Sequence, residues 1–142
     1  MELTDALDYV RNKRNGVLAT AKADGRPQLS NISFALSEDG IIRISITADR
    51  AKAKNMRRTP AVSLHVTAED FWSYVVLEGD AELSEAAAAP EDATADELVA
   101  MYRSMAGEHP NWDEYRAAAV ADRRLVVRLR PTRAYGMLPA AG

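Results

Sequence analysis

Short runs in which apolar and polar residues alternate occupy most of the chain between residues 16 and 84. Residues 42–47 read IRISIT and residues 61–67 read AVSLHVT, so every second side chain is a branched aliphatic one. A period of two is typical of strands that bury one face and leave the other polar. These runs therefore predict a sheet built from consecutive antiparallel strands.

The first two strands of this sheet should form a hairpin. Residues 16–21 are a short apolar run, and residues 27–36 continue as a second strand. Asp24-Gly25 lies between the two runs and is a strong turn signal.

Two further strands follow from the same reasoning. Residues 71–84 read as one long strand that carries Trp72 and Tyr74 on the same face. Leu125, Val127 and Leu129 indicate a last strand, and Pro131 should separate it from the ending TRAYGML because proline cannot donate to a sheet ladder.

Three segments have helical spacing. The first residues form an amphipathic pattern that Thr4 or Asp5 can cap and that Gly16 should end. A second pattern begins near Leu98 and runs up to Gly107, and residues 111–123 predict another helix capped by Asn111.

Together these elements predict an α+β domain, mainly β, with peripheral helices over residues 1–142. Closure of the sheet into a small barrel is favoured because it removes exposed edges. An open sheet with helices on one face remains the alternative.

Composition narrows the function classes. The net charge is −3, which argues against a surface built for nucleic acid, and the absence of cysteine excludes disulfides and thiol catalysis. No apolar run is long enough to span a bilayer and no signal peptide is evident, so we expect a cytoplasmic protein. His65 and His109 each lack a second ligand nearby, so no metal site is expected.

A strongly basic turn, RAKAKNMRR, follows the strand at residues 42–47. On a helix beginning at Arg50, most of the basic side chains share one broad face, whereas Lys52 falls on the opposite side, toward the sheet. A lysine in that position normally needs an anionic partner, and a phosphate is one. The alternative is a solvated basic face with the Lys52 stem extending outward, and spacing alone does not separate the two.

The hairpin and the long strand hold the other candidates. Residues 28–33 place four polar side chains in an otherwise buried strand, which favours a pocket wall over simple cross-strand bonding. Trp72 and Tyr74 offer flat rings that suit an aromatic cofactor, although ordinary core or dimer-interface roles are the commoner reading. No P-loop, Rossmann or hydrolase-elbow motif occurs, so any chemistry should come from a cofactor.

Three stretches resemble one known family: GVLATAKADGRPQLSNISF, ISITADRAKAKNMRRTPAVSL and WSYVVLEGDAELS. They are similar to the flavin/deazaflavin oxidoreductases, the pyridoxamine 5'-phosphate oxidase-like split barrels, over nearly the whole chain. AGEHPNWDEYR and the YGM ending most resemble the branch that uses the deazaflavin coenzyme F420, which is typical of actinobacteria. The resemblance implies a six-stranded split β-barrel of the FMN-binding type, assembled as a homodimer with cofactor sites between the chains.

The resemblance also implies roles for individual residues. The cofactor phosphate would be held by Ser45, Thr47, Arg50, Lys52 and Asn55, with a backbone contact from Ala51. The strand along the isoalloxazine-like ring would be Gln28, Leu29, Ser30 and Asn31. Trp72 and Tyr74 would reach over from the partner chain.

The activity implied is an F420-dependent reduction, in which hydride passes to an unsaturated or conjugated small organic substrate. No obligatory proton donor is evident, and Tyr74 and Lys52 are the candidates. The alternatives are an FMN-dependent enzyme like pyridoxamine 5'-phosphate oxidase and a non-catalytic cofactor carrier. The chain lacks the longer C-terminal extension of true pyridoxamine phosphate oxidases, and RNA binding by the basic turn ranks last.

Overall fold

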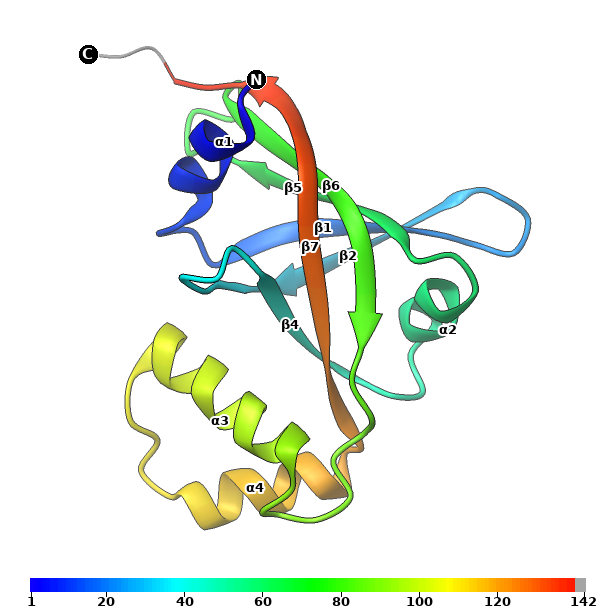
Figure 1. Ribbon diagram of the computed structural model, residues 1–142, viewed down its shortest axis with the longest axis vertical. Helices are drawn as coiled ribbons and strands as arrows, with labels where there is room; N and C mark the ends of the chain where they lie inside the picture. The colour runs from blue at the N-terminus through cyan, green and yellow to red at the C-terminus, as the bar shows by residue number, and fades with distance from the viewer. Residues whose placement is uncertain (140–142) are drawn as a thin grey trace.

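The computed structural model describes residues 1–139, and the chain winds around one antiparallel sheet of seven strands (Figure 1). Across the sheet the strands lie in the order β2-β1-β5-β6-β7-β4-β3. The strands are β1 (Asn15–Ala21), β2 (Pro27–Ser33), β3 (Ala35–Leu36), β4 (Ile42–Thr47), β5 (Ala61–Thr67), β6 (Tyr74–Leu83) and β7 (Arg124–Met137). The last three residues of the domain expected over residues 1–142 lie outside the described part.

The sheet is a curled split barrel, as expected, but it has seven strands rather than six. The run at residues 27–36 divides because Phe34 and Ala35 are both buried, which breaks the alternation after Ser33. Ala35 then pairs with Arg43 of β4 instead of continuing along β1. The run at residues 27–36 thus forms both edge strands of the sheet, β2 at one edge and β3 at the other. Their direct connection brings β2 near β4.

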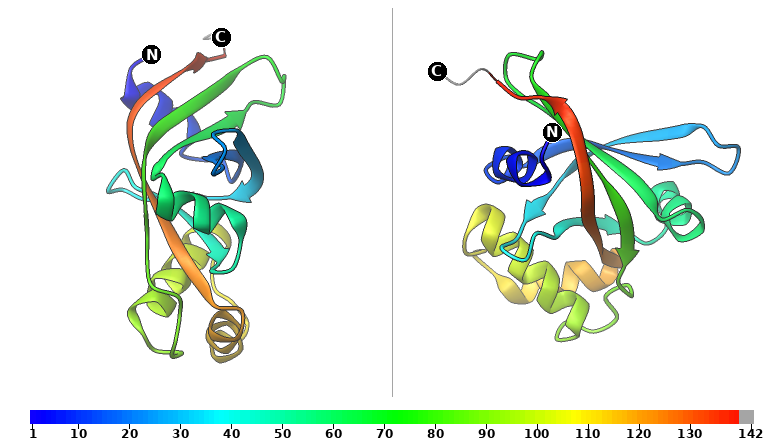
Figure 2. Two further views of the ribbon diagram at one scale, coloured as in Figure 1. Left: turned by 90° about the vertical axis from the view of Figure 1, so that its right-hand side faces the viewer. Right: turned by 45° about the horizontal axis from the view of Figure 1, so that its top comes forward.

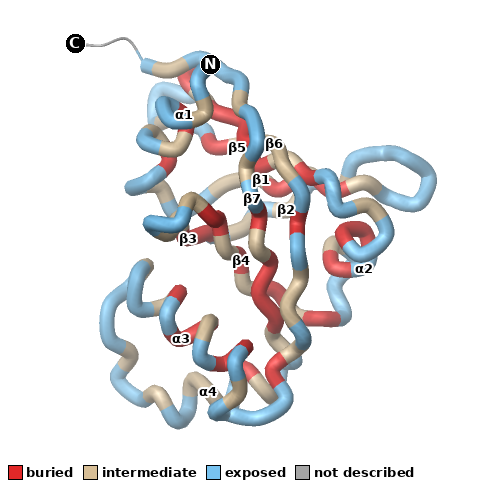
Figure 3. Tube along the Cα trace, viewed as in Figure 1, coloured by how far each residue is buried: buried red, intermediate tan, exposed pale blue. Residues whose placement is uncertain are grey.

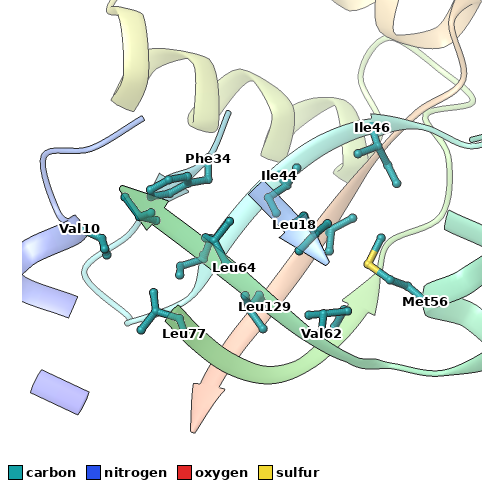
Figure 4. Packing of buried hydrophobic residues seen from close by; sticks show 14 of the residues in the cluster. Val10, Leu18, Phe34, Ile44, Ile46, Met56, Val62, Leu64, Leu77 and Leu129 are labelled. Atoms are coloured by element: carbon teal, nitrogen blue, oxygen red, sulfur yellow. The ribbon is translucent and has the colours of Figure 1, made fainter. Parts of the chain in front are cut away.

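Aliphatic side chains fill the inside of the barrel. Leu18, Leu64 and Leu77 lie directly opposite one another on β1, β5 and β6, and each is fully buried. Figure 4 shows this cluster, with Met56 of α2 (Ala51–Arg58) and Val10 of α1 (Leu3–Val10) packed at its ends. Alternate residues of the same strands face outward, which explains the strict polar alternation in the sequence.

The first helix, α1, packs on the barrel through Ala6 and Val10 (Figure 2). Its predicted capping by Thr4 or Asp5 was wrong, because Glu2 is the N-cap residue and makes no side-chain bond there. Gly16 does not end the helix either. It lies inside β1, where a Cβ would stand 2.9 Å from the His65 carbonyl oxygen, so close strand contact explains the glycine.

Two helices, α3 (Ala93–Ala106) and α4 (Trp112–Ala121), form a hairpin between β6 and β7. Their ends follow the sequence signals: Gly107 has a φ of 78° after α3, and Asn111 Oδ1 accepts from the Glu114 N–H at 3.1 Å. The fourth helix stops at Ala121, two residues before the predicted end. Figure 3 marks the buried positions of α3 in red, and two of them, Leu98 and Met101, form a second small core with Val126.

The expected break at Pro131 was wrong, because β7 runs through it to Met137. Proline removes one ladder hydrogen bond, and the sheet accommodates this with a register shift between Glu78 and Gly79. Gly79 pairs with Pro131, and a Cβ on Gly79 would overlap the Arg130 carbonyl oxygen. The bulge therefore requires glycine at this position.

The long strand predicted at residues 71–84 begins only at Tyr74. Before it, the Asp70 carboxylate accepts from the Ser73 N–H at 2.9 Å, and Phe71 has a φ of 70°. Trp72 therefore lies on a turn between β5 and β6, not on a strand face beside Tyr74.

Candidate cofactor site

The basic segment after β4 is a helix with an open N-terminus. Arg50 is the N-cap residue of α2 and provides no side-chain cap, and the first turn contains no acidic residue. Within the described part of the chain, the N–H groups of Ala51 and Lys52 donate to no backbone acceptor. Free N–H groups and the positive end of the helix dipole together favour an anion at this point.

Lys52 occupies the position that helical spacing predicted. Arg50, Lys54, Arg57 and Arg58 are exposed, whereas Lys52 is half-buried on the side that also buries Asn55. Among residues 1–139 it forms no ion pair with a carboxylate. Burial lowers the Lys52 pKa, and the positive charges of Arg50 and Arg124 lower it further. An anion bound here would reverse these effects.

A hollow of about 660 Å³ opens at the start of α2, and Thr47, Arg50 and Ala51 line one wall of it. The Arg50 Nε donates to Thr47 Oγ1 at 3.2 Å. The Asp49 carboxylate lies on the same wall, and a hydrogen bond from Thr47 is the main reason that its pKa is lowered. Asp49 is exposed, so a ligand that enters the hollow does not have to move a buried carboxylate.

The opposite wall contains residues that sequence reasoning missed. Asp122 and Arg123, from the turn between α4 and β7, line the same hollow, and the neighbouring Arg124 Nη1 lies 3.4 Å from Ser45 Oγ. Ser45 and Arg124 also line an adjoining hollow of about 330 Å³ with Tyr115. The register Thr47↔Arg124 brings these arginines to the basic turn, a long-range pairing that no local motif reveals.

The predicted ring strand, β2, presents its residues alternately to two sides. Gln28 and Ser30 are half-buried, whereas Leu29 and Asn31 are exposed. The Asn55 Nδ2 of α2 donates to Gln28 Oε1 at 2.7 Å, so the helix and the strand are joined directly. Figure 1 shows α2 beside the β1–β2 hairpin, and Figure 2 shows the same neighbourhood from two other sides.

On the outer face of the sheet, His65 shares a hollow with Asn31 and stacks on Tyr74. Asn31 lies opposite Val17, and Val17 lies opposite His65, so the three form one row across the strands. A hollow of about 520 Å³ contains Asn31 and His65, and the rings of His65 and Tyr74 stack with centroids 5.3 Å apart. Sequence reasoning treated His65 as an ordinary histidine, although the alternation of β5 already placed it on the open face.

The family model for pyridoxamine 5'-phosphate oxidase matches residues 3–138 of the chain. The chain belongs to the pyridoxamine 5'-phosphate oxidase family. This family assignment agrees with the split barrel.

Solved structures give the same fold. A conserved hypothetical protein of Mycobacterium tuberculosis is 25% identical with a TM-score of 0.74, and the match covers 100% of this chain and 91% of that one. A structure described as an F420 reductase is 26% identical with a TM-score of 0.67, covering 91% and 94% of the two chains. The haem storage protein HutZ of Vibrio cholerae, at 20% identity and a TM-score of 0.68 over 96% and 95% of the chains, shows the fold alone.

Most of the predicted site residues of this family member form three groups, and Leu29 and Trp72 lie apart from them. Thr47, Arg50 and Ala51 line the basic hollow, with Ser45 in the adjoining one. Asn31 lines the hollow that contains His65, and Tyr74 stacks on His65. Gln28 and Asn55 lie between β2 and α2. Leu29 is 67% exposed, and Trp72 is 75% exposed and packs edge-on against Phe71.

Residues 1–139 bring together no group of three histidine or acidic side chains suited to a metal ion. No helix in this range has the length and apolar character needed to cross a membrane.

Proposed function

We propose that this protein is a cytoplasmic, F420-dependent reductase that transfers hydride to an unsaturated or conjugated small organic molecule. It works as a homodimer of single split-barrel domains, with the cofactor lying between the chains. The observation that carries the proposal is the open N-terminus of α2, where half-buried Lys52 lies beside Arg50 and Arg124 without a carboxylate partner among residues 1–139. The likeness to an F420 reductase, at 26% identity, supports the choice of cofactor.

The residues at the helix start suit a phosphate monoester or diester. Free backbone N–H groups and Lys52 supply donors and positive charge, and Arg50 and the Thr47 hydroxyl line the same wall. Gln28 on β2 is tied to this helix through Asn55, so a ligand with both a phosphate and a flat ring meets two fixed elements. When bound, a reduced deazaflavin supplies two electrons at once as a hydride from a ring carbon.

The protein's own task is to orient the reactants and to keep the ring face accessible to substrate. The open outer face around Asn31 and His65 provides such a space. For the proton that completes a reduction, Tyr74 and Lys52 are the candidate donors, with solvent as the alternative. A Tyr74→Phe or Lys52→Ala variant that binds cofactor and turns over normally would remove that residue from the mechanism.

The cofactor assignment is tested by titrating the protein with oxidised F420 and, separately, with FMN, following tryptophan fluorescence. Lys52→Ala should weaken F420 binding at least tenfold, whereas the matched control Lys54→Ala, on the exposed side of the same helix, should not. Preference for FMN would move the protein to the flavin-dependent alternative. Tight F420 binding without reduction of any conjugated acceptor would support a carrier, and binding of neither cofactor would refute the proposal.

A further inference from the structure

A chain of hydrogen bonds runs from the end of α2 to the edge strand β2. Arg58 Nη2 donates to Asn55 Oδ1 at 2.8 Å and to the Ala21 carbonyl oxygen at 3.0 Å. Arginine only donates hydrogen bonds, because its guanidinium stays protonated. The atom of Asn55 that faces Arg58 must therefore be its oxygen, which fixes the orientation of the Asn55 amide.

The fixed Asn55 amide points its nitrogen toward the β1–β2 hairpin. Asn55 is only 6% exposed, and its Nδ2 donates to Thr20 Oγ1 at 3.1 Å and to Gln28 Oε1 at 2.7 Å. Both N–H groups of Asn55 are thus engaged within the protein. This arrangement favours a positioning role for Asn55 over direct contact with a phosphate.

The same logic fixes Gln28. Since its oxygen faces an N–H of Asn55, its amide nitrogen must face the other way. Among residues 1–139, the Gln28 amide nitrogen donates to no hydrogen-bond acceptor, and the side chain is half-buried at the edge of the sheet. Gln28 therefore offers two N–H donors to a ligand, while its oxygen is turned toward Asn55.

We propose that Arg58 acts through Asn55 to set the hydrogen-bond polarity of Gln28, so that the group bound next to Gln28 must present an acceptor. This inference rests on the proposed function, in which β2 lies along the ring of the cofactor. Gln28 should select ligands that place a carbonyl or an anionic oxygen next to it. Ligands that place an ammonium or amino group there are disfavoured. Arg58 and Thr20 are then positioning residues, because neither needs to touch the ligand.

The polarity itself can be measured on the cofactor-free protein by NMR of side-chain amides, with the Gln28 signals assigned from their loss in Gln28→Glu. The Gln28 NH₂ protons should exchange rapidly with water, and those of Asn55 should be protected. In Asn55→Asp, a carboxylate accepts from Arg58 and has no N–H for Gln28. Gln28 must then turn its nitrogen inward, and its NH₂ protons should become protected. Protected Gln28 protons in the unsubstituted protein would overturn the proposal.

Ligand binding gives the second readout. Gln28→Glu still accepts from Asn55 but offers no donor outward, so affinity for the oxidised cofactor should fall at least tenfold. Arg58→Leu should weaken binding, and Arg58→Lys should restore it because lysine is also only a donor. Arg57→Leu, which removes a neighbouring exposed charge outside the chain of bonds, is the matched control. Equal effects of Arg57→Leu and Arg58→Leu would reduce the role of Arg58 to general charge and refute the proposal.

The two proposals fail separately. If neither F420 nor FMN binds to the unsubstituted protein, the proposed function fails, while the exchange of the Gln28 amide still tests the polarity. If cofactor binds and Gln28→Glu leaves its affinity unchanged, the inference about Gln28 fails and the proposed function stands. Asn55→Asp places a carboxylate in a buried position, so its unfolding temperature should be checked. If Asn55→Asp does not fold, Gln28→Glu, on the edge strand, still tests the proposal through its effect on cofactor affinity.

Discussion

The Glu97 carboxylate of α3 accepts a hydrogen bond from Arg43 Nε of β4 at 2.8 Å and also binds Arg128 of β7. The three side chains are partly shielded, with 17 to 24% of each exposed. Together these side chains connect α3 to the neighbouring strands β4 and β7. This network of one carboxylate and two arginines therefore holds α3 on the outer face of β4 and β7, whose ends carry the basic hollow.

Glu97→Gln should destabilise the protein by about 2 kcal/mol at neutral pH, because it removes a charged partner from two shielded arginines. Hydrogen bonds from Arg128, with a smaller one from Arg43, lower the Glu97 pKa below its ordinary value of 4.5, although burial opposes this. A lowered carboxyl pKa gives stability that is present above pH 4.5 and is lost as pH falls through the folded-state value. Urea unfolding of both proteins from pH 7 to pH 3 should therefore show a difference that shrinks in acid.

The matched control for Glu97 is Asp8→Asn, which removes an exposed pair with Arg11 at 3.4 Å. Exposed pairs contribute between zero and about 1 kcal/mol, so this variant should unfold almost like the unsubstituted protein. A Glu97→Gln difference that stays constant between pH 7 and pH 3 would show that the carboxylate charge is not the source of the stability.

Gly79→Ala tests the bulge opposite Pro131. A Cβ at this position would overlap the backbone carbonyl of Arg130, and backbone cannot move aside as a flexible side chain does. We expect a loss of about 2 kcal/mol or more, measured by thermal unfolding. Asp80→Ala, at the next and exposed position of β6, is the control and should change stability little. Equal stability of the two variants would mean that β7 shifts freely around the bulge.

Much of this fold could be predicted from local patterns, but its irregular points could not. Alternation found β4 and β5, and Asn111 and Gly107 marked helix ends, because each signal lies within a few residues of its effect. Pro131 was misread because the glycine that accommodates it lies on another strand. Arg124 was missed as a site residue for the same reason, because its partner Ser45 is 79 residues away along the chain. Arg58 is only three residues from Asn55, but its role depends on the bond from Asn55 to Gln28, which is 27 residues further away.

Affinity for a phosphate-bearing cofactor should depend on pH through Lys52. Burial first, then Arg50 and Arg124, lower the Lys52 pKa from its ordinary 10.5, and a bound anion should raise it again. Below the free-protein pKa, Lys52 is charged with or without ligand, so affinity stays constant. Above that value, binding must take up a proton and affinity falls as pH rises. Calorimetric titrations between pH 7 and pH 10 should show this decline.

Lys52→Arg separates this effect from general titration of the protein, because arginine stays charged over the whole range. The variant should bind the cofactor with little pH dependence between pH 7 and pH 10. If both proteins lose affinity in parallel, another group is responsible for the decline and Lys52 is not the residue that meets the anion.

The proposed homodimer should form through the outer face of the sheet. Tyr135 lies opposite Val76, which lies opposite His65, so this row continues to Asn31 at the edge. Met137, two residues after Tyr135 on β7, is 61% exposed and Tyr135 is 49% exposed, so two large apolar side chains are exposed together here. Met137→Lys should convert a dimer to a monomer in light scattering, whereas Glu38→Lys, in the exposed turn before β4, should not.

Because the partner chain would complete the site, the monomer should also lose cofactor affinity. A monomeric Met137→Lys variant that binds normally would place the site within one chain.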